Sequence, residues 1–150
     1  MIVFRIAKRK RASDMFGTGA ALYPGRWNKK GTSVLYSGET IEIALLENIV
    51  HTPPMFIPDF DILTMEIPDD SITEIKVAEL PSNWMKYPAP LIIAEIGEEW
   101  ILKAETIALK VPSCIIATSF NYILNCKHLD FNRVKVIDHS HFLFDPRLTT

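Results

Sequence analysis

The sequence has few cysteines and no long hydrophobic run, and each shortage excludes a class of protein. Its 150 residues include two cysteines, Cys114 and Cys126. They are too few for a disulfide framework and lack the paired spacing of a zinc site, which favours a reducing compartment and predicts no metal centre. No stretch approaches the roughly 18 consecutive apolar residues of a membrane helix. The first residues carry their charges after a short apolar run, the reverse of a secretory signal, so we expect a cytoplasmic protein without membrane contact.

An excess of one charge is also missing. The chain has 16 basic and 18 acidic residues and a formal net charge of -2, which gives the whole molecule no electrostatic reason to bind nucleic acid. The block KRKR at residues 8–11 is the one strong basic patch. We interpret it as a solvated loop, with contact to phosphates or to an acidic partner as the alternative.

Phosphate-binding glycine loops are absent as well. Neither GxGxxG nor GxxxxGK[ST] occurs in the sequence, so a nucleotide would have to be held in another way. What is present is ordinary for a globular protein, with 48% hydrophobic and 23% charged residues. A chain of this length buries one sizeable core, and we expect a single domain over residues 1–150.

Hydrophobic periodicity and turn residues predict a mixture of strands and helices. We expect strands over residues 2–6, 33–36, 60–67, 72–77, 134–137 and 141–144, and helices over residues 41–50 and 91–106. Short apolar runs cover 108–111 and 114–117, a helical turn is expected over 119–124, and long loops over 7–28 and 80–90. Because strands and helices do not alternate regularly, the fold class is α+β rather than a doubly wound sheet.

Glu47 is the most unusual residue of the first predicted helix. On a helical wheel it lies about 40° from Ile43 and about 60° from Ala44, among apolar positions that cover most of the circumference. A helix that is apolar nearly all round is largely buried. A buried carboxylate there needs a partner or must take up a proton. Glu47 is therefore either a boundary residue that reaches solvent or pairs with a structural arginine, or part of a pocket.

Arg26 and Tyr36 precede Glu47 in the same stretch, and together the three residue types suit one ligand. A guanidinium presents paired donors that match a diphosphate. An aromatic ring offers a stacking face for a flat heterocycle. A carboxylate stabilises the positive charge that develops on a sugar when its glycosidic bond breaks. Diphosphate, flat ring and a scissile N-glycosidic bond occur together in NAD, although each residue on its own also has a purely structural explanation.

Five segments in order carry a resemblance to a known family: GRWNKKG at residues 25–31, Tyr36, ALLE ending at Glu47, VPSCIIATSFNYILN at 111–125, and FDPRL near the end. This set resembles the RES-domain toxins of bacterial toxin-antitoxin systems over nearly the whole chain. The resemblance implies a compact fold similar to the NAD-binding core of ADP-ribosyltransferases. It also implies degradation of NAD as the activity and a cognate helix-turn-helix antitoxin as the partner that blocks the site.

The resemblance further implies roles for individual residues. Arg26, with Trp27 beside it, would bind the NAD phosphates, Tyr36 would pack on the nicotinamide or its ribose, and Glu47 would face the ribose whose bond breaks. Ser113 and Asn121 match polar positions of the family and would contact the ribose or the nicotinamide amide. NAD would be the substrate, and no metal is implied.

Several alternatives remain open at this stage. The same site would serve hydrolysis or phosphorolysis of NAD, or transfer of ADP-ribose to a protein target. From other classes come an RNA-cleaving toxin and a catalytically silent binding module. Cys126 with His128 is a weak nucleophile candidate, and His139 with His141 a weak metal candidate. The acceptor, the preference for NAD or NADP, and homo-oligomerisation do not follow from the sequence.

Overall fold

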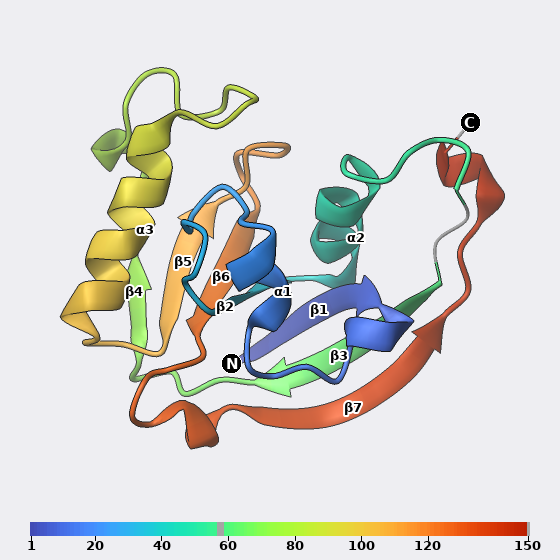
Figure 1. The fold of residues 1–150 in the computed structure, drawn as a ribbon, viewed down its shortest axis with the longest axis horizontal. Helices are drawn as coiled ribbons and strands as arrows, with labels where there is room; N and C mark the ends of the chain where they lie inside the picture. The colour runs from blue at the N-terminus through green and yellow to red at the C-terminus, as the bar shows by residue number, and fades with distance from the viewer. Residues whose placement is uncertain (57–58, 150) are drawn as a thin grey trace.

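A mixed sheet of seven strands organises the chain in the computed structural model, which describes residues 1–56 and 59–149 (Figure 1). The strand order is β4-β5-β6-β2-β1-β3-β7. Neighbouring strands are antiparallel except for the parallel pair β4 and β5. The strands are β1 (Ile2–Lys8), β2 (Val34–Gly38), β3 (Phe60–Glu66), β4 (Ile72–Glu74), β5 (Ala108–Pro112), β6 (Phe120–Asn125) and β7 (Lys135–Phe142).

Within the residues that the structure describes, three α-helices connect and cover these strands: α1 (Thr18–Leu22), α2 (Ile41–Ile49) and α3 (Leu91–Lys103). Helix α2 begins where the sequence predicts, because the Thr40 hydroxyl accepts a hydrogen bond from the Ile43 amide at 3.2 Å. Helix α3 ends at Ala104, whose φ of 50° lies in the left-handed region. Short 3-10 turns are found at Arg9–Arg11, Val77–Glu79, Phe131–Arg133 and Pro146–Thr149.

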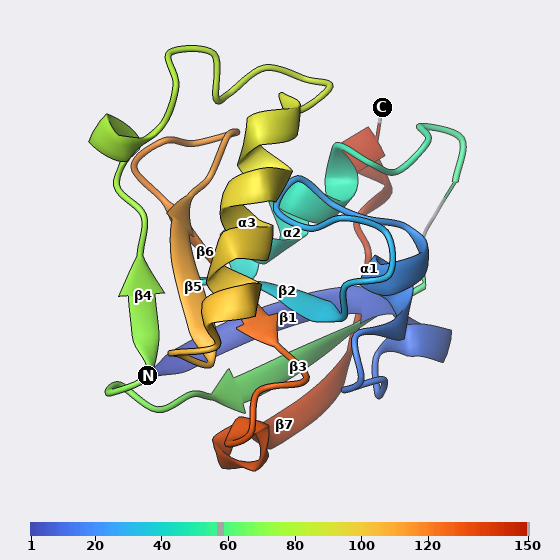
Figure 2. The same cartoon turned by 60° about the vertical axis from the view of Figure 1, so that its left-hand side comes forward.

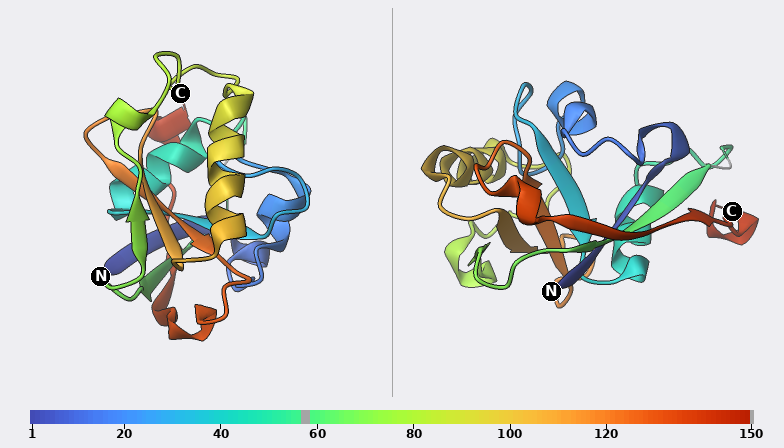
Figure 3. Two further views of the ribbon diagram at one scale, coloured as in Figure 1. Left: turned by 90° about the vertical axis from the view of Figure 1, so that its left-hand side faces the viewer. Right: turned by 90° about the horizontal axis from the view of Figure 1, so that it is seen from below.

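The sheet is strongly twisted, so its two ends face different neighbours. In Figure 1, β5 and β6 run steeply while β1, β3 and β7 cross the view, and Figure 2 shows α3 lying along the β4–β5 end. Helix α3 packs on that end through Ile93 and Trp100, which join a buried cluster with Leu109 and Ile123. Helix α2 packs toward the other end (Figure 3). There Ala44 belongs to a buried cluster with Ile6 of β1 and Phe60 of β3.

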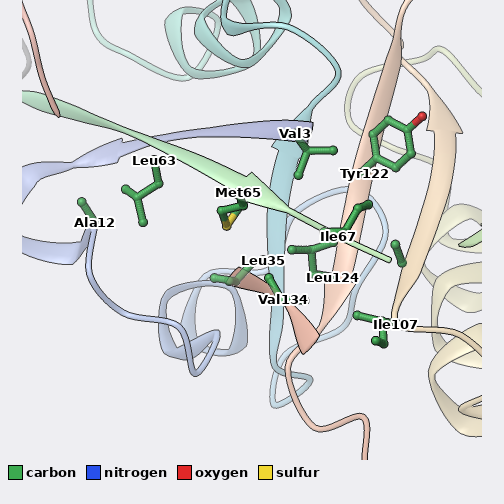
Figure 4. Close-up of a cluster of buried hydrophobic side chains, with 11 residues drawn as sticks. Val3, Ala12, Leu35, Leu63, Met65, Ile67, Ile107, Tyr122, Leu124 and Val134 are labelled. Atoms are coloured by element: carbon green, nitrogen blue, oxygen red, sulfur yellow. The ribbon is translucent and has the colours of Figure 1, made fainter. Parts of the chain in front are cut away.

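The opposite face of the sheet holds a further core cluster. Side chains from both ends of the sheet meet there because the twist folds the strands toward one another (Figure 4). Its buried members are Val3, Ala12, Leu35, Leu63, Met65, Ile67, Ile107, Ala108, Tyr122, Leu124 and Val134. Strands β2 and β6 therefore have packed side chains on both faces, which fixes the centre of the sheet.

Two predicted elements are wrong near the end of the chain. Residues 119–124 were expected to form a helical turn, but Phe120–Asn125 is β6, paired with β2 on one side and β5 on the other. A strand buried on both faces shows no alternation of polar and apolar residues, which explains the error. The two short strands expected around residue 139 are one strand, β7, which follows β3 past an irregularity at Thr64/Met65.

Two other expectations are wrong in extent. The predicted loop over 7–28 contains the turn Arg9–Arg11 and helix α1, and the strand expected over 72–77 ends at Glu74 and leads into the turn Val77–Glu79. The run 114–117 forms no strand, and Ile116 is exposed.

The α+β class is confirmed by the mixed sheet and its helices. No helix within residues 1–56 and 59–149 is long and apolar enough to cross a membrane.

Candidate functional site

A cavity of about 860 Å³ brings together residues that are far apart in the sequence. Its wall includes the GRW segment after α1, strand β2, helix α2, the start of β6 and the loop before α3. The predicted residues Arg26, Trp27, Tyr36, Glu47 and Asn121 all line it. Cavities of this size accommodate ligands as large as a dinucleotide.

Glu47 is half-buried on α2 and is held by donors from the other end of the chain. Its Oε1 accepts a hydrogen bond from Ser113 Oγ at 2.8 Å and another from Asn121 Nδ2 at 2.7 Å. Within the described part of the chain these bonds fall on the same oxygen, which leaves Oε2 available to a ligand in the cavity. The carboxylate is therefore oriented before any ligand arrives.

Ser113 lies behind Glu47 rather than on the cavity wall, which corrects the expectation of a direct ligand contact. It has no exposed surface. Its hydroxyl donates to Glu47 and accepts hydrogen bonds from the amides of Ile115 at 3.1 Å and Ile116 at 3.3 Å. Ser113 thus caps the turn after β5 and holds the carboxylate at the same time. Asn121, by contrast, lines the cavity as expected.

Arg26 projects into the cavity from the segment after α1 and is anchored at its tip. Its Nη1 donates to the Trp84 carbonyl at 2.8 Å and its Nη2 to the Lys86 carbonyl at 3.0 Å. A guanidinium has five N–H donors, so these bonds leave donors for an anionic ligand. Arg26 therefore both fixes the loop before α3 and presents positive charge to the cavity.

Trp27 belongs mainly to the protein core. Only 4% of it is exposed, and its ring packs with Trp84 and Ile93 beneath α3. Its backbone carbonyl lies against Gly97 of α3, where a Cβ would overlap it. The sequence places Trp27 among the ligand contacts, but the structure shows that most of its surface supports the segment that carries Arg26.

Tyr36 lies in the middle of β2 with its hydroxyl turned toward the GRWN segment. The hydroxyl accepts a hydrogen bond from the Trp27 amide at 3.0 Å and donates one to Asn28 Oδ1 at 2.6 Å. Burial, outweighing the opposing hydrogen bonds, raises the pKa of Tyr36 well above its ordinary value. The phenol is therefore neutral and internally bonded, and what it offers a ligand is its ring.

A basic wall lies along the same cavity. It includes part of the KRKR block, for which contact to phosphates was the alternative interpretation, and Arg5, which the sequence interpretation missed. Arg5, Lys8 and Arg11 line it together with Tyr23, and the guanidinium of Arg11 lies 5.8 Å from the centre of the Tyr23 ring. Arg5 is fixed by a hydrogen bond to the Ala12 carbonyl at 3.0 Å. Arg5 stands between the apolar residues Val3 and Ile6 in a predicted strand, and this placement could have been noticed in the sequence.

Both cysteines carry thiols that are less acidic than usual. Burial raises the pKa of Cys126 to about 12, and burial also raises the pKa of Cys114, which lines the cavity. His128 Nδ1 accepts a hydrogen bond from the Asp130 amide. This arrangement speaks against a cysteine nucleophile.

His139 and His141 point to one side of β7, as expected, but they meet a carboxylate on the neighbouring strand. His139 Nε2 lies 2.7 Å from Asp61 Oδ2, and His141 Nδ1 lies 3.2 Å from Asp61 Oδ1. Among the residues described, no group of three or more His, Cys, Asp or Glu side chains is arranged to hold a metal ion. The pair tethers β7 to β3.

Known proteins resemble the chain in sequence and in fold. The RES domain family matches residues 2–145. The protein "Toxin Res" of Yersinia enterocolitica is 35% identical over 151 residues, covering 99% of both chains. The "Prs ADP-ribosylating toxin" of a Sphingobium species is 31% identical over 146 residues, covering 95% of this chain and 91% of that protein. In fold, a chain of the Mycobacterium tuberculosis MbcT-MbcA toxin-antitoxin complex superposes with a TM-score of 0.79 at 13% identity, covering 99% of this chain and 86% of that chain.

Proposed function

Because the chain belongs to the RES domain family, we propose that it is the toxin of a toxin-antitoxin system and that it cleaves NAD between nicotinamide and ribose. The observation that carries this proposal is the convergence of Arg26, Tyr36 and Glu47 on one cavity of about 860 Å³. A cation, a ring and an oriented carboxylate match the diphosphate, the heterocycle and the reacting sugar of one dinucleotide.

Each residue has a defined part in the reaction. Arg26, with the basic wall of Arg5 and Arg11, binds the diphosphate. The ring of Tyr36 packs on the nicotinamide or its ribose, and Asn121 contacts the nicotinamide amide. Glu47 directs Oε2 at the ribose and stabilises its developing positive charge.

The chemistry needs no acid to expel the leaving group. The bond between ribose C1′ and the nicotinamide nitrogen breaks, and its electron pair neutralises the positive charge of the pyridinium ring. An oxygen of water or of inorganic phosphate then forms the new bond to C1′. Water loses its proton in this step, so the products of hydrolysis are nicotinamide, ADP-ribose and a proton.

Transfer of ADP-ribose to a protein is the second candidate. It is favoured by the 31% identity to a protein named an ADP-ribosylating toxin. The site residues are the same in both reactions, and the acceptor is whichever nucleophile reaches C1′.

An antitoxin is the proposed partner, of the helix-turn-helix type that the sequence resemblance implies. The likeness in fold to a chain of a toxin-antitoxin complex supports it. Exposed aromatic and apolar side chains at the cavity support it as well, since Tyr23 is 74%, Tyr87 80% and Val50 58% exposed. A partner that covered them would close the cavity to NAD.

The test is to incubate the purified chain, free of antitoxin, with NAD and to measure nicotinamide. The protein should release it, and Glu47→Gln should lower turnover by about 10² to 10³-fold while remaining folded. NAD labelled in the adenosine portion separates the candidates, because label retained on protein indicates transfer and free ADP-ribose indicates hydrolysis. A folded protein that releases no nicotinamide would contradict hydrolysis, and one that releases none when cell lysate supplies protein acceptors would also contradict transfer. Loss of cellular RNA with constant NAD would favour an RNA-cleaving toxin instead.

A further inference from the structure

Asn28 lies two residues after Arg26 in the chain and is buried, with 2% of its surface exposed. Its Oδ1 accepts hydrogen bonds from the Gly25 amide at 2.8 Å and the Tyr36 hydroxyl at 2.6 Å. Its Nδ2 donates to backbone carbonyls on the other side, at 2.9 Å to Ala20 and 3.2 Å to Thr32. A buried amide whose oxygen and nitrogen are both engaged has one defined orientation.

These hydrogen bonds fix the backbone on both sides of Arg26. The Gly25 amide, before Arg26, donates a hydrogen bond to Asn28 Oδ1. The Trp27 amide, after Arg26, donates to the Tyr36 hydroxyl, which itself donates to Asn28 Oδ1. The Asn28 carboxamide and the Tyr36 hydroxyl therefore form one unit that joins the Arg26 segment to β2.

Close packing on two sides also restrains the segment. A Cβ on Gly25 would lie 2.7 Å from the Tyr36 ring, and a Cβ on Gly97 would overlap the Trp27 carbonyl. Glu98 Oε1 also accepts a hydrogen bond from the Lys29 amide at 2.8 Å. Strand β2 and helix α3 thus clamp the segment from two sides, and Asn28 is the side chain inside the segment that connects to β2.

We propose that Asn28 is a positioning residue that holds Arg26 at the cavity wall in the orientation that binds the ligand diphosphate. Asn28 acts through Arg26, because its own carboxamide is buried and fully occupied. The ligand named here rests on the proposed function, whereas the clamp itself does not.

Hydrogen exchange without any ligand tests the clamp. Asn28→Ala should raise the exchange rates of the Gly25 and Trp27 amides by about two- to tenfold, the range that corresponds to the loss of one ordinary hydrogen bond. Tyr36→Phe removes the other half of the unit and should raise the Trp27 rate in the same way. Ser71→Ala is the matched control, because Ser71 is buried and accepts a hydrogen bond from the Ile107 amide away from the cavity. Unchanged Gly25 and Trp27 rates in folded Asn28→Ala, or in Tyr36→Phe should the first variant not fold, would overturn the proposal whether or not NAD is the substrate.

Kinetics with NAD test the connection to Arg26. Asn28→Ala should raise KM about tenfold and leave kcat within about twofold, since the loss is in ligand binding. In an Arg26→Ala background the same change should have less than about a twofold effect on KM, because its target is already gone. Equal effects in both backgrounds, or a loss confined to kcat, would overturn the role assigned to Asn28. If the native protein releases no nicotinamide, the proposed function fails, and the exchange rates still decide whether the clamp exists.

Discussion

Glu47 carries its hydrogen bonds on one carboxylate oxygen, and this asymmetry determines how neighbouring substitutions should act. Ser113 and Asn121 both donate to Oε1. They fix the orientation of the carboxylate in advance and leave Oε2 without a donor from Ser113 or Asn121. Removing one donor should leave the Glu47 carboxylate in place but make its orientation less well defined.

Ser113→Ala should lower kcat about tenfold with KM nearly unchanged, because the bond it removes from Glu47, of about 0.5 to 1.5 kcal/mol, is to a group that acts in the transition state. The two bonds it removes from the Ile115 and Ile116 amides affect the turn after β5. Nicotinamide release under saturating NAD measures this. Ser71→Ala, which removes a buried hydrogen bond away from the cavity, should retain full kcat. A change in KM alone would show that Ser113 contributes to binding rather than to the position of Glu47.

Tyr36 should not contribute an ionisation to the pH profile. Burial raises the pKa of its hydroxyl, so the group stays neutral at and above the pH at which a free tyrosine titrates, about 10. Native protein and Tyr36→Phe should therefore show the same shape of kcat against pH up to about pH 10, even if their absolute rates differ. An alkaline limb present in the native protein and lost in Tyr36→Phe would contradict this.

At the scale of elements, α3 supports the site without lining the cavity. Gly97 lets the helix approach the Trp27 carbonyl so closely that no side chain fits between them. The glycine is unfavourable for an isolated helix by about 1 kcal/mol relative to alanine. Its presence there is explained by the contact it allows.

Gly97→Ala should therefore destabilise the protein and raise KM, although alanine is the better helix former. The Cβ would displace Trp27, and the Arg26 segment with it. Thermal unfolding and NAD kinetics measure the two effects. Glu95→Ala, an exposed change on the same helix, is the control and should alter neither. A Gly97→Ala protein that is more stable with normal KM would show that helix propensity outweighs the contact.

The elements that could be predicted from sequence are those with a local signal. Helix α2 was predicted from its cap at Thr40 and its apolar spacing, and Glu47 stood out as a polar residue within it. Strand β6 was missed because its character depends on two neighbours, β2 and β5, that lie elsewhere in the chain. The role of Ser113 was missed for the same reason, since its partner Glu47 is 66 residues away.

At the scale of the whole molecule, the far edge of the sheet is held by side-chain hydrogen bonds as well as by backbone pairing. Strand β7 is exposed along most of its length. Its attachment to β3 is reinforced where His139 and His141 meet Asp61, a carboxylate that is 6% exposed. The attachment should therefore depend on pH.

Asp61→Asn should reduce the loss of stability in acid. The hydrogen bond with His139, joined by that with His141, lowers the pKa of Asp61 against the opposing effect of burial. The unfolded carboxyl, with a pKa of about 3.9, therefore takes up a proton at higher pH than the folded one. The stabilisation is present above about pH 4 and is lost as the pH falls through the lower folded pKa.

Urea unfolding at about pH 7, 5 and 3 measures this dependence as the free energy of unfolding. The native protein should lose more stability between about pH 5 and 3 than Asp61→Asn does. His128→Ala, outside this cluster, serves as a control and should keep the native acid dependence. Equal losses of unfolding free energy in the native protein and in Asp61→Asn would show that Asp61 is not responsible for the acid dependence.

The place of β6 in the middle of the sheet also has a consequence for biosynthesis. Asn121, on this late strand, is 74 residues beyond Glu47, which it orients. A nascent chain that has not yet released β6 from the ribosome lacks the strand between β2 and β5. Glu47 then lacks the hydrogen bond from Asn121 that orients its carboxylate. The cavity is therefore completed only after β6 has been synthesised and has paired with β2 and β5.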